Sequence, residues 1–208
     1  ARLVTDSDGT LVTTYSGISP NPDIRECDAC IKTIRENACD LVVALGGGSV
    51  LDCAKAAALF CTATLPAGDY LDRKIPLPPD RLPLIAIPTT AGTGSEITRV
   101  VLSDHEKGIK TPLDTPAFYP DTALVDPKLT WTVPRHITAC TGMDVLCHAI
   151  EAYWNIHHQP VCDALAIHAI RLVFRYLETA CEEPSNPLAR EKMAEASVTA
   201  GMAFSLPG

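Results

Sequence analysis

Two periodicities of apolar residues alternate along the first part of the chain. A β-rich run at 11–15 and apolar runs at 41–45 and 84–87 predict strands. The run at 41–45 ends in glycines, which is typical of a parallel strand covered on both faces. Apolar residues at three- and four-residue steps predict a helix over 23–37, and small apolar residues predict another over 54–61. This alternation predicts a parallel sheet with right-handed crossovers.

The pattern changes after residue 133. Before it, short strands are expected at 97–103 and 122–125, with an irregular segment at 107–120 between them and a Pro-rich surface loop at 64–83. Beyond it, the apolar spacing is helical throughout. Three helices are predicted there, over 136–152, 161–181 and 187–204. We therefore expect one domain at 1–133 and a second, helical domain at 134–208.

Composition narrows the class of protein. The 208 residues carry 17 basic and 25 acidic side chains, a net charge of −8, which argues against a nucleic-acid partner. No apolar stretch approaches the ~18 residues of a membrane span, and the first residues lack the layout of a signal peptide. Nine cysteines, an odd number, are typical of reduced thiols in a cytoplasmic protein.

A glycine turn separates the second strand from the helix after it. Gly46, Gly47 and Gly48 would allow a ligand to approach the backbone, and the free N–H groups of the helix would attract a phosphate. Ser49 could cap the helix and donate to the same phosphate. A turn used only for packing is the alternative, because the G-x-G-x-x-G spacing of the usual dinucleotide motif is absent.

The segment 88–96 follows the next buried strand and is rich in hydroxyl groups and glycines. Open α/β sheets bind ligands at this carboxyl edge of their strands. A solvated turn is the simpler interpretation of this segment alone. Two such segments after successive strands together favour a shared nucleotide site.

Asp144 and His148 lie four residues apart, and so on one face of a predicted helix. A carboxylate and an imidazole so placed can share a divalent metal, but spacing alone favours a hydrogen-bonded pair in the core, since a metal takes three or four protein ligands. Cys27 and Cys30 have C-x-x-C spacing within a helix and no second pair, which favours core-filling thiols. Lys110, in the irregular segment, is a candidate cofactor contact.

Five stretches in this order resemble the iron-containing, group III alcohol dehydrogenase family. They are Gly-Ile-Ser-Pro-Asn-Pro (17–22), Asp-Leu-Val-Val-Ala-Leu-Gly-Gly-Gly-Ser-Val-Leu-Asp (40–52), Pro-Thr-Thr-Ala-Gly-Thr-Gly-Ser-Glu (88–96), Val-Asp-Pro-Lys-Leu-Thr (125–130) and Thr-Gly-Met-Asp-Val-Leu-Cys-His-Ala-Ile-Glu-Ala-Tyr (141–153). The resemblance implies an α/β Rossmann-like N-terminal domain and an all-α C-terminal domain, the architecture of dehydroquinate synthase. A nicotinamide cofactor and a metal would lie between them.

The resemblance also implies roles for individual residues. Asp144 and His148 would be catalytic metal ligands, for Fe(II) or, as in some members, zinc, nickel or manganese. The implied cofactor contacts are Gly47, Gly48, Ser49, Asp52, Thr89, Thr93, Thr98, Lys110, Leu129 and Thr132. Ser16 stands where many NAD-preferring members carry an acidic residue, so NAD(H) and NADP(H) both remain open.

Two departures from the family pattern suggest an incomplete record of a longer protein. The family's two further histidine ligands follow the motif at 201–205, where this sequence ends three residues later. Near the N-terminus, Val4–Asp6 resembles the end of a first strand, and 7–10 is too short for a parallel crossover to the next.

The resulting expectation is an NAD(P)-dependent oxidoreductase acting on a small alcohol or aldehyde, with a homodimer implied by the resemblance. Two alternatives stay open. One is a nucleotide-binding module without catalysis, because half of the metal site is missing. The other is a lyase or synthase on the same fold.

Overall fold

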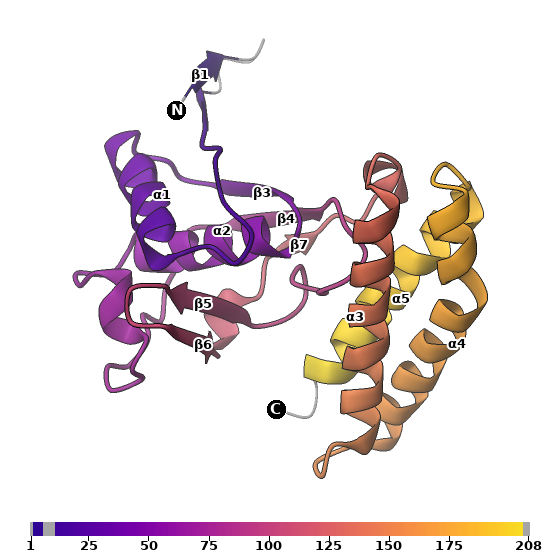
Figure 1. The fold of residues 1–208 in the computed structure, drawn as a ribbon. Helices are drawn as coiled ribbons and strands as arrows, with labels where there is room; N and C mark the ends of the chain where they lie inside the picture. Colours follow the sequence, from indigo (N-terminus) through magenta and orange to yellow (C-terminus); the bar gives the residue numbers. More distant parts are fainter. Residues whose placement is uncertain (1, 6–10, 206–208) are drawn as a thin grey trace.

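The computed structural model describes residues 2–5 and 11–205 and divides them into two parts. Figure 1 shows strands and two helices in the first part and three long helices standing side by side in the second. This arrangement confirms the predicted order of an α/β region followed by an all-α region.

The parallel sheet contains three strands in the order β3–β4–β7. They are β3 (Val42–Gly46), β4 (Leu84–Pro88) and β7 (Thr122–Ala123). Helix α2 (Gly48–Phe60) connects β3 to β4 and packs on one face. On the other face Val43 and Leu45 are 55% and 57% exposed, while Ala44 between them is buried. The prediction of a strand covered on both faces is therefore wrong, because α2 packs only on the Ala44 side.

The predicted strand at 11–15 exists but does not join this sheet. Strand β2 (Leu11–Thr14) pairs antiparallel with β1 (Arg2–Thr5), with Leu11 opposite Thr5. Neighbouring antiparallel strands need no crossover, which removes the parallel arrangement expected for 11–15. The expectation about the length of 7–10 lies outside the described residues.

A second hairpin occupies part of the segment expected to be irregular. Strand β5 (Val100–Asp104) pairs antiparallel with β6 (Ile109–Leu113), so Lys110 lies in a strand and the prediction for 107–120 is wrong there. A 3-10 helix, η2 (Pro116–Phe118), follows. The expected surface loop at 64–83 contains η1 (Ala67–Tyr70), whose Tyr70 ring stacks on Phe60 at 5.0 Å between centroids. Cross-strand pairing and aromatic packing thus order segments with weak local signals.

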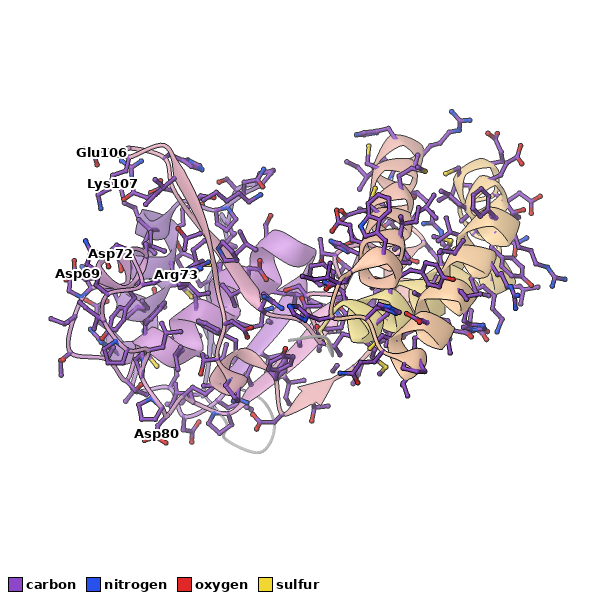
Figure 2. All side chains as sticks on the ribbon, turned by 90° about the horizontal axis from the view of Figure 1, so that it is seen from below. Asp69, Asp72, Arg73, Asp80, Glu106 and Lys107 are labelled. Carbon is purple, nitrogen blue, oxygen red and sulfur yellow. The ribbon has the colours of Figure 1, made fainter. Side chains whose placement is uncertain are left out.

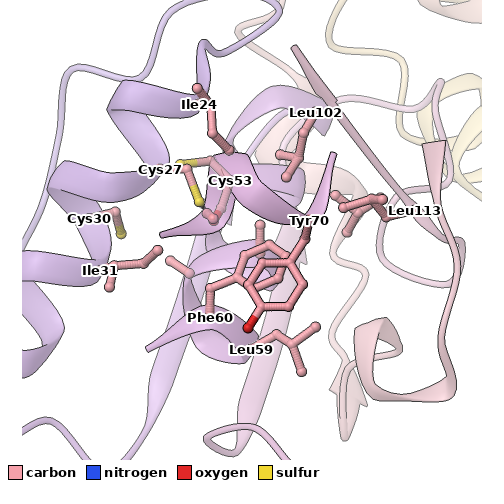
Figure 3. Packing of buried hydrophobic residues seen from close by; sticks show 14 of the residues in the cluster. Ile24, Cys27, Cys30, Ile31, Cys53, Leu59, Phe60, Tyr70, Leu102 and Leu113 are labelled. Atoms are coloured by element: carbon pink, nitrogen blue, oxygen red, sulfur yellow. Dashed lines mark hydrogen bonds between the residues drawn. The ribbon is translucent and has the colours of Figure 1, made fainter. Parts of the chain in front are cut away.

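Helix α1 (Ile24–Glu36) begins at a capping box, in which Asp23 accepts from the helix backbone and Glu26 accepts from Asp23 N. Its buried face packs on α2 around a core that includes Cys27, Cys30 and Cys53 (Figure 3). A hydrogen bond with Cys53, together with burial, raises the pKa of Cys30, and a hydrogen bond with Cys27, together with burial, raises the pKa of Cys53. Raised pKa values make thiols poor nucleophiles, so these groups fill the core, as expected for a C-x-x-C pair inside a helix without a second pair.

The helical part contains α3 (Arg135–Trp154), α4 (Pro160–Glu182) and α5 (Pro187–Ser205), close to the predicted bounds. Alanines dominate their shared core, which lets the helix backbones approach closely. At Gly142 an added Cβ would lie 2.2 Å from a methyl carbon of Leu177. Close packing of small residues therefore holds α3 against α4.

The charged loops lie at the outer end of the α/β part. Figure 2 shows Asp69, Asp72, Arg73, Glu106 and Lys107 on the side remote from α3, α4 and α5. None of the helices within residues 11–205 is both long and apolar enough to cross a membrane.

Candidate active site

The glycine turn places the start of α2 against the hydroxyl-rich segment 88–96. Gly47 is the N-cap of α2, and no side chain caps the first turn. A Cβ added to Gly48 would lie 2.6 Å from Oγ1 of Thr93, and one added to Gly47 would lie 3.4 Å from Oγ1 of Thr90. The two segments that the sequence predicted to share a site are thus in direct contact. The uncapped N–H groups give this end of the helix a partial positive charge.

Ser49 does not cap the helix, contrary to the expectation, because it lies inside α2. Its hydroxyl oxygen accepts from Asn21 N at 3.1 Å. Lys110 Nζ donates to Asn21 Oδ1 at 3.2 Å, so Asn21 joins Lys110 to the glycine turn. Asn21 has a φ of 53°, which an asparagine tolerates better than most residues. Sequence reasoning missed this bridge, although the Pro-Asn-Pro turn was its visible signal.

Asp52 points into the protein rather than toward the glycine turn. Its carboxylate accepts from Ser95 Oγ at 2.5 Å and from Val101 N at 3.1 Å, and it pairs with Lys55 Nζ at 3.1 Å. These bonds join α2 to the segment 88–96 and to β5. Asp52 therefore holds α2, the segment 88–96 and β5 together.

The other predicted cofactor contacts are divided between two places. Thr89 N donates to Gly46 O at 2.9 Å, which keeps Thr89 beside the glycine turn. Thr98 is buried just before β5. Leu129 lies in η3 (Pro127–Thr130) and exposed Thr132 follows it, where η3 contacts α5. The structure thus brings Thr89 and Thr93 to the turn and leaves Leu129 and Thr132 on the helical side.

Two glycines let the segment 88–96 dock closely on the helical part. A Cβ on Gly92 would lie 2.6 Å from Cβ of Thr141 in α3. Gly94 has a φ of +61°, and its Cβ would lie 3.2 Å from Cα of Gly201 in α5. No side chain fits either position without displacing its neighbours. The segment therefore lies between the glycine turn and the helices α3 and α5.

Asp144 and His148 lie on α3 beside this contact. Asp144 Oδ1 and His148 Nε2 are 3.8 Å apart, and the side chains are 43% and 24% exposed. That separation is too long for a hydrogen bond, so the bonded core pair favoured by spacing alone is absent. The His148 ring lies 5.2 Å from that of Phe204, and the Arg99 guanidinium lies 5.8 Å from the Phe204 ring.

The chemistry of this pair suits a divalent metal, but the number of donors is incomplete. Imidazole nitrogen and carboxylate oxygen are ordinary ligands of iron and zinc. Within residues 2–5 and 11–205, no group of three or more His, Cys, Asp or Glu side chains is placed to hold one ion. Asp144 and His148 thus supply two donors, where a metal takes three or four protein ligands.

Lys55 is a second residue that sequence reasoning missed. It is fully buried, and its ammonium contacts Asp52 and three backbone carbonyls of the segment 95–99. A lysine three residues after an aspartate, in a helix of otherwise small apolar residues, was the available signal. Burying a charged lysine is costly without such partners.

Two hollows lie away from the glycine turn. One of about 420 Å³ is lined by Tyr70, Arg73 and Arg99, among others, and one of about 450 Å³ lies between α1 and residues 64–67. Neither is lined by a residue predicted to bind cofactor or metal. The candidate site is thus defined by contacts between segments.

Comparison with family models gives two adjacent matches. Residues 2–127 match a model described as iron-containing alcohol dehydrogenase, and residues 138–208 match the C-terminal model of the Fe-containing alcohol dehydrogenase family. Similar curated proteins include a probable alcohol dehydrogenase, EutG, of Escherichia coli K12, 47% identical over 90% of this chain and 47% of its own length. The 1-propanol dehydrogenase PduQ of Salmonella typhimurium is 43% identical over 95% of this chain and 50% of its own.

Solved structures share the fold. The sulfoacetaldehyde reductase of Bifidobacterium kashiwanohense, solved with NAD+, superposes with a TM-score of 0.93 at 53% identity, over 97% of this chain and 54% of its own. A 1,3-propanediol oxidoreductase gives a TM-score of 0.86 at 40% identity, over 94% and 51%. The chain spans about half the length of the relatives that it matches.

Proposed function

We propose an activity on one premise: the chain belongs to the iron-containing alcohol dehydrogenase family. The protein is an NAD(P)-dependent oxidoreductase that interconverts a small alcohol and its aldehyde. The observation that carries this proposal is the segment 88–96, which contacts the glycine turn on one side and α3 and α5 on the other. A cofactor at the turn would thus lie beside Asp144 and His148.

The proposed domains are a dinucleotide-binding unit at 1–133 and a metal-binding unit at 134–208. The strands end at Ala123, and Pro134 is the N-cap of the first long helix, which supports a boundary there. The nine free cysteines support a reducing, cytoplasmic location. A homodimer is part of the proposal and rests on resemblance alone.

The cofactor half would be organised by the start of α2. The N–H groups of Gly47, Gly48 and Ser49 would receive the pyrophosphate, and Lys110 would approach the same ligand through its position beside Asn21. The remaining proposed contacts are Thr89, Thr93, Thr98, Leu129 and Thr132, whereas Asp52, which turns inward, would act on the cofactor only through Ser95 and Lys55. Bound nicotinamide supplies the hydride acceptor or donor at its C4. NADP(H) is the less supported choice, since a similar structure is solved with NAD+.

Asp144 and His148 would supply two ligands of a divalent metal. Iron is favoured by the family, with zinc, nickel or manganese as alternatives. Such an ion acts as a Lewis acid toward an alcohol or carbonyl oxygen. The Phe204 ring lies 5.2 Å from the His148 ring, and the His148 side chain is 24% exposed.

Metal and cofactor titrations of matched histidine variants test the proposal. Replacing His148 with Ala should weaken Fe(II) or Zn(II) binding by at least about 100-fold and abolish aldehyde reduction. NADH affinity should stay within about twofold, because His148 lies outside the glycine turn. His136→Ala, an exposed position on the same helix, is the control. Metal binding that survives in His148→Ala would sink the assignment.

A nucleotide-binding module without catalysis is the second candidate. The two-donor set of the described residues favours it. NADH binding by the wild-type chain without metal binding or aldehyde reduction would support this module over the dehydrogenase. The third expectation, a lyase or synthase, has no support among these relatives, which are alcohol dehydrogenases and an aldehyde reductase.

A further inference from the structure

Lys55 is the most completely enclosed charged group in the described chain. It is 0% exposed, and its ammonium donates to Ser95 O at 2.7 Å, Arg99 O at 3.0 Å and Thr98 O at 3.1 Å. Asp52 Oδ1 lies 3.1 Å from the same nitrogen. The three protons of the ammonium are therefore matched by carbonyls of one short segment, while a carboxylate balances the charge.

This arrangement is expensive if it serves only packing. Burial lowers the pKa of Lys55, which reflects the cost of removing its charge from water. An apolar side chain of similar volume in a helix core commonly stabilises a protein as well or better. The three carbonyls lie where the chain is neither helix nor strand, just before β5. Lys55 thus supplies the hydrogen bonds that regular structure would otherwise provide.

The segment held by Lys55 connects both halves of the proposed site. Its N-terminal neighbour Thr93 contacts Gly48 at the glycine turn. Its C-terminal end is Arg99, whose guanidinium lies over Phe204, the ring beside His148. Displacement of 95–99 would therefore move the wall of the cofactor half and the edge of the metal half together.

We propose that Lys55, paired with Asp52, is a positioning residue that holds the segment 95–99 in the conformation that admits the nicotinamide cofactor. It acts through the three carbonyls, since no part of it is exposed to a ligand. The inference rests on the proposed function, because it presumes a cofactor at the glycine turn.

The test separates positioning from simple stability. Lys55→Met removes the charge and the three donors at similar volume, whereas Leu59→Ala opens a cavity beside the same helix and removes none of the Lys55 hydrogen bonds. NADH affinity is measured by fluorescence titration at a temperature where each variant is folded. Lys55→Met should weaken NADH binding by about tenfold, and Leu59→Ala should leave it within about twofold despite lower stability.

Amide hydrogen exchange provides a readout independent of the cofactor. In Lys55→Met the amides of 94–101 should exchange faster, while those of the rest of α2 stay protected. Asp52→Asn is a milder variant and should weaken NADH binding by about threefold, so the inference remains testable if Lys55→Met does not fold.

The outcomes are distinguishable. If wild-type protein does not bind NADH, the proposed function fails, and hydrogen exchange alone decides whether Lys55 orders the segment. If wild-type binds NADH and Lys55→Met binds it equally well, the inference is wrong. Equal weakening by Leu59→Ala would also overturn it, because stability alone would then account for the effect.

Discussion

Two buried cations stabilise the two parts of this molecule in different ways. Lys55 in the α/β part has Asp52 beside it and donates to a segment at the proposed site. Arg190 in α5 is 3% exposed and donates to Pro184 O, Val133 O and Thr138 Oγ1. Among the described residues, no carboxylate forms an ion pair with it. Burial accordingly lowers the pKa of Arg190.

The difference indicates separate roles for the two groups. Arg190 joins the α4–α5 turn, the start of α3 and Val133 next to the boundary, so it holds the helical part to the chain that enters it. Lys55 holds a segment that faces the proposed cofactor. Lys55, which has a carboxylate beside it, thus lies next to the proposed site. Arg190, which bonds only to carbonyls and a hydroxyl, lies in the helical part.

The largest effect on the free energy of unfolding is expected at Arg190, and this variant tests whether the two cations have separate roles. Arg190→Ala should lower the free energy of unfolding by about 3–4 kcal/mol, because it leaves a cavity and buried acceptors without donors. NADH affinity of the folded protein should not change, in contrast to Lys55→Met. Urea unfolding and NADH titration measure the two quantities.

Arg171→Ala, an exposed arginine on α4, is the control for Arg190 and should cost no more than about 0.5 kcal/mol. Weaker NADH binding in folded Arg190→Ala would show that the helical cation also acts on the cofactor site. The proposed separation of roles would then be lost.

A smaller effect is expected where the two parts meet. Gly94→Ala should cost about 2–3 kcal/mol, since it adds left-handed strain and a contact with Gly201. Gly108→Ala has a nearly equal φ of +64° with nothing within 4 Å, and should cost about 1 kcal/mol. The difference between these variants in thermal or urea unfolding measures the close approach of the two parts. Equal losses would mean that Gly94 is needed only for its φ.

The smallest effect concerns Glu96, a buried acid whose pKa is influenced by the charge of Lys55. Burial raises the pKa of the Glu96 carboxyl, and the charge of Lys55 only partly opposes this. The stability gained from the protonated carboxyl is complete below about pH 4 and is lost as the pH rises through the raised pKa.

The free energy of unfolding of the wild type, relative to that of Glu96→Gln, should therefore be highest in acid and fall toward pH 8. Urea unfolding across this pH range measures it, with exposed Glu106→Gln as the control. If the wild type instead becomes more stable relative to Glu96→Gln as the pH rises, Lys55 stabilises ionised Glu96 more than burial opposes it.

Local patterns predicted the helices well and the strand pairing poorly. The predicted helix at 136–152 became Arg135–Trp154, because its spacing and its flanking prolines act within a few residues. The strand at 11–15 was located correctly but assigned to the wrong sheet, since its partner is chosen by contacts outside the strand. Lys110 was placed in an irregular segment for the same reason, as β6 depends on β5 for its hydrogen bonds.

The sequence predicted the motifs of the candidate site but not the hydrogen bonds that join them. Each of the three motifs occupies a short stretch of sequence, so its chemistry could be inferred directly. They are the glycine turn, the segment 88–96 and the pair of Asp144 and His148. Asn21 bonds to Ser49, 28 positions later, and to Lys110, 89 positions later. The hydrogen bonds of Lys55 to backbone carbonyls span 40 to 44 positions. No periodicity of the chain reports such distances.

The sequence by itself determined which residues could bind phosphate and metal, and which family the chain resembles, because these depend on side-chain chemistry at short spacings. Tertiary structure alone decided that Asp52 turns inward, that Asp144 and His148 stand 3.8 Å apart, and that one sheet face stays open. Those outcomes depend on which distant segments exclude water from a given group. The cost of burying a charge such as Lys55 is met only when the fold brings its partners together.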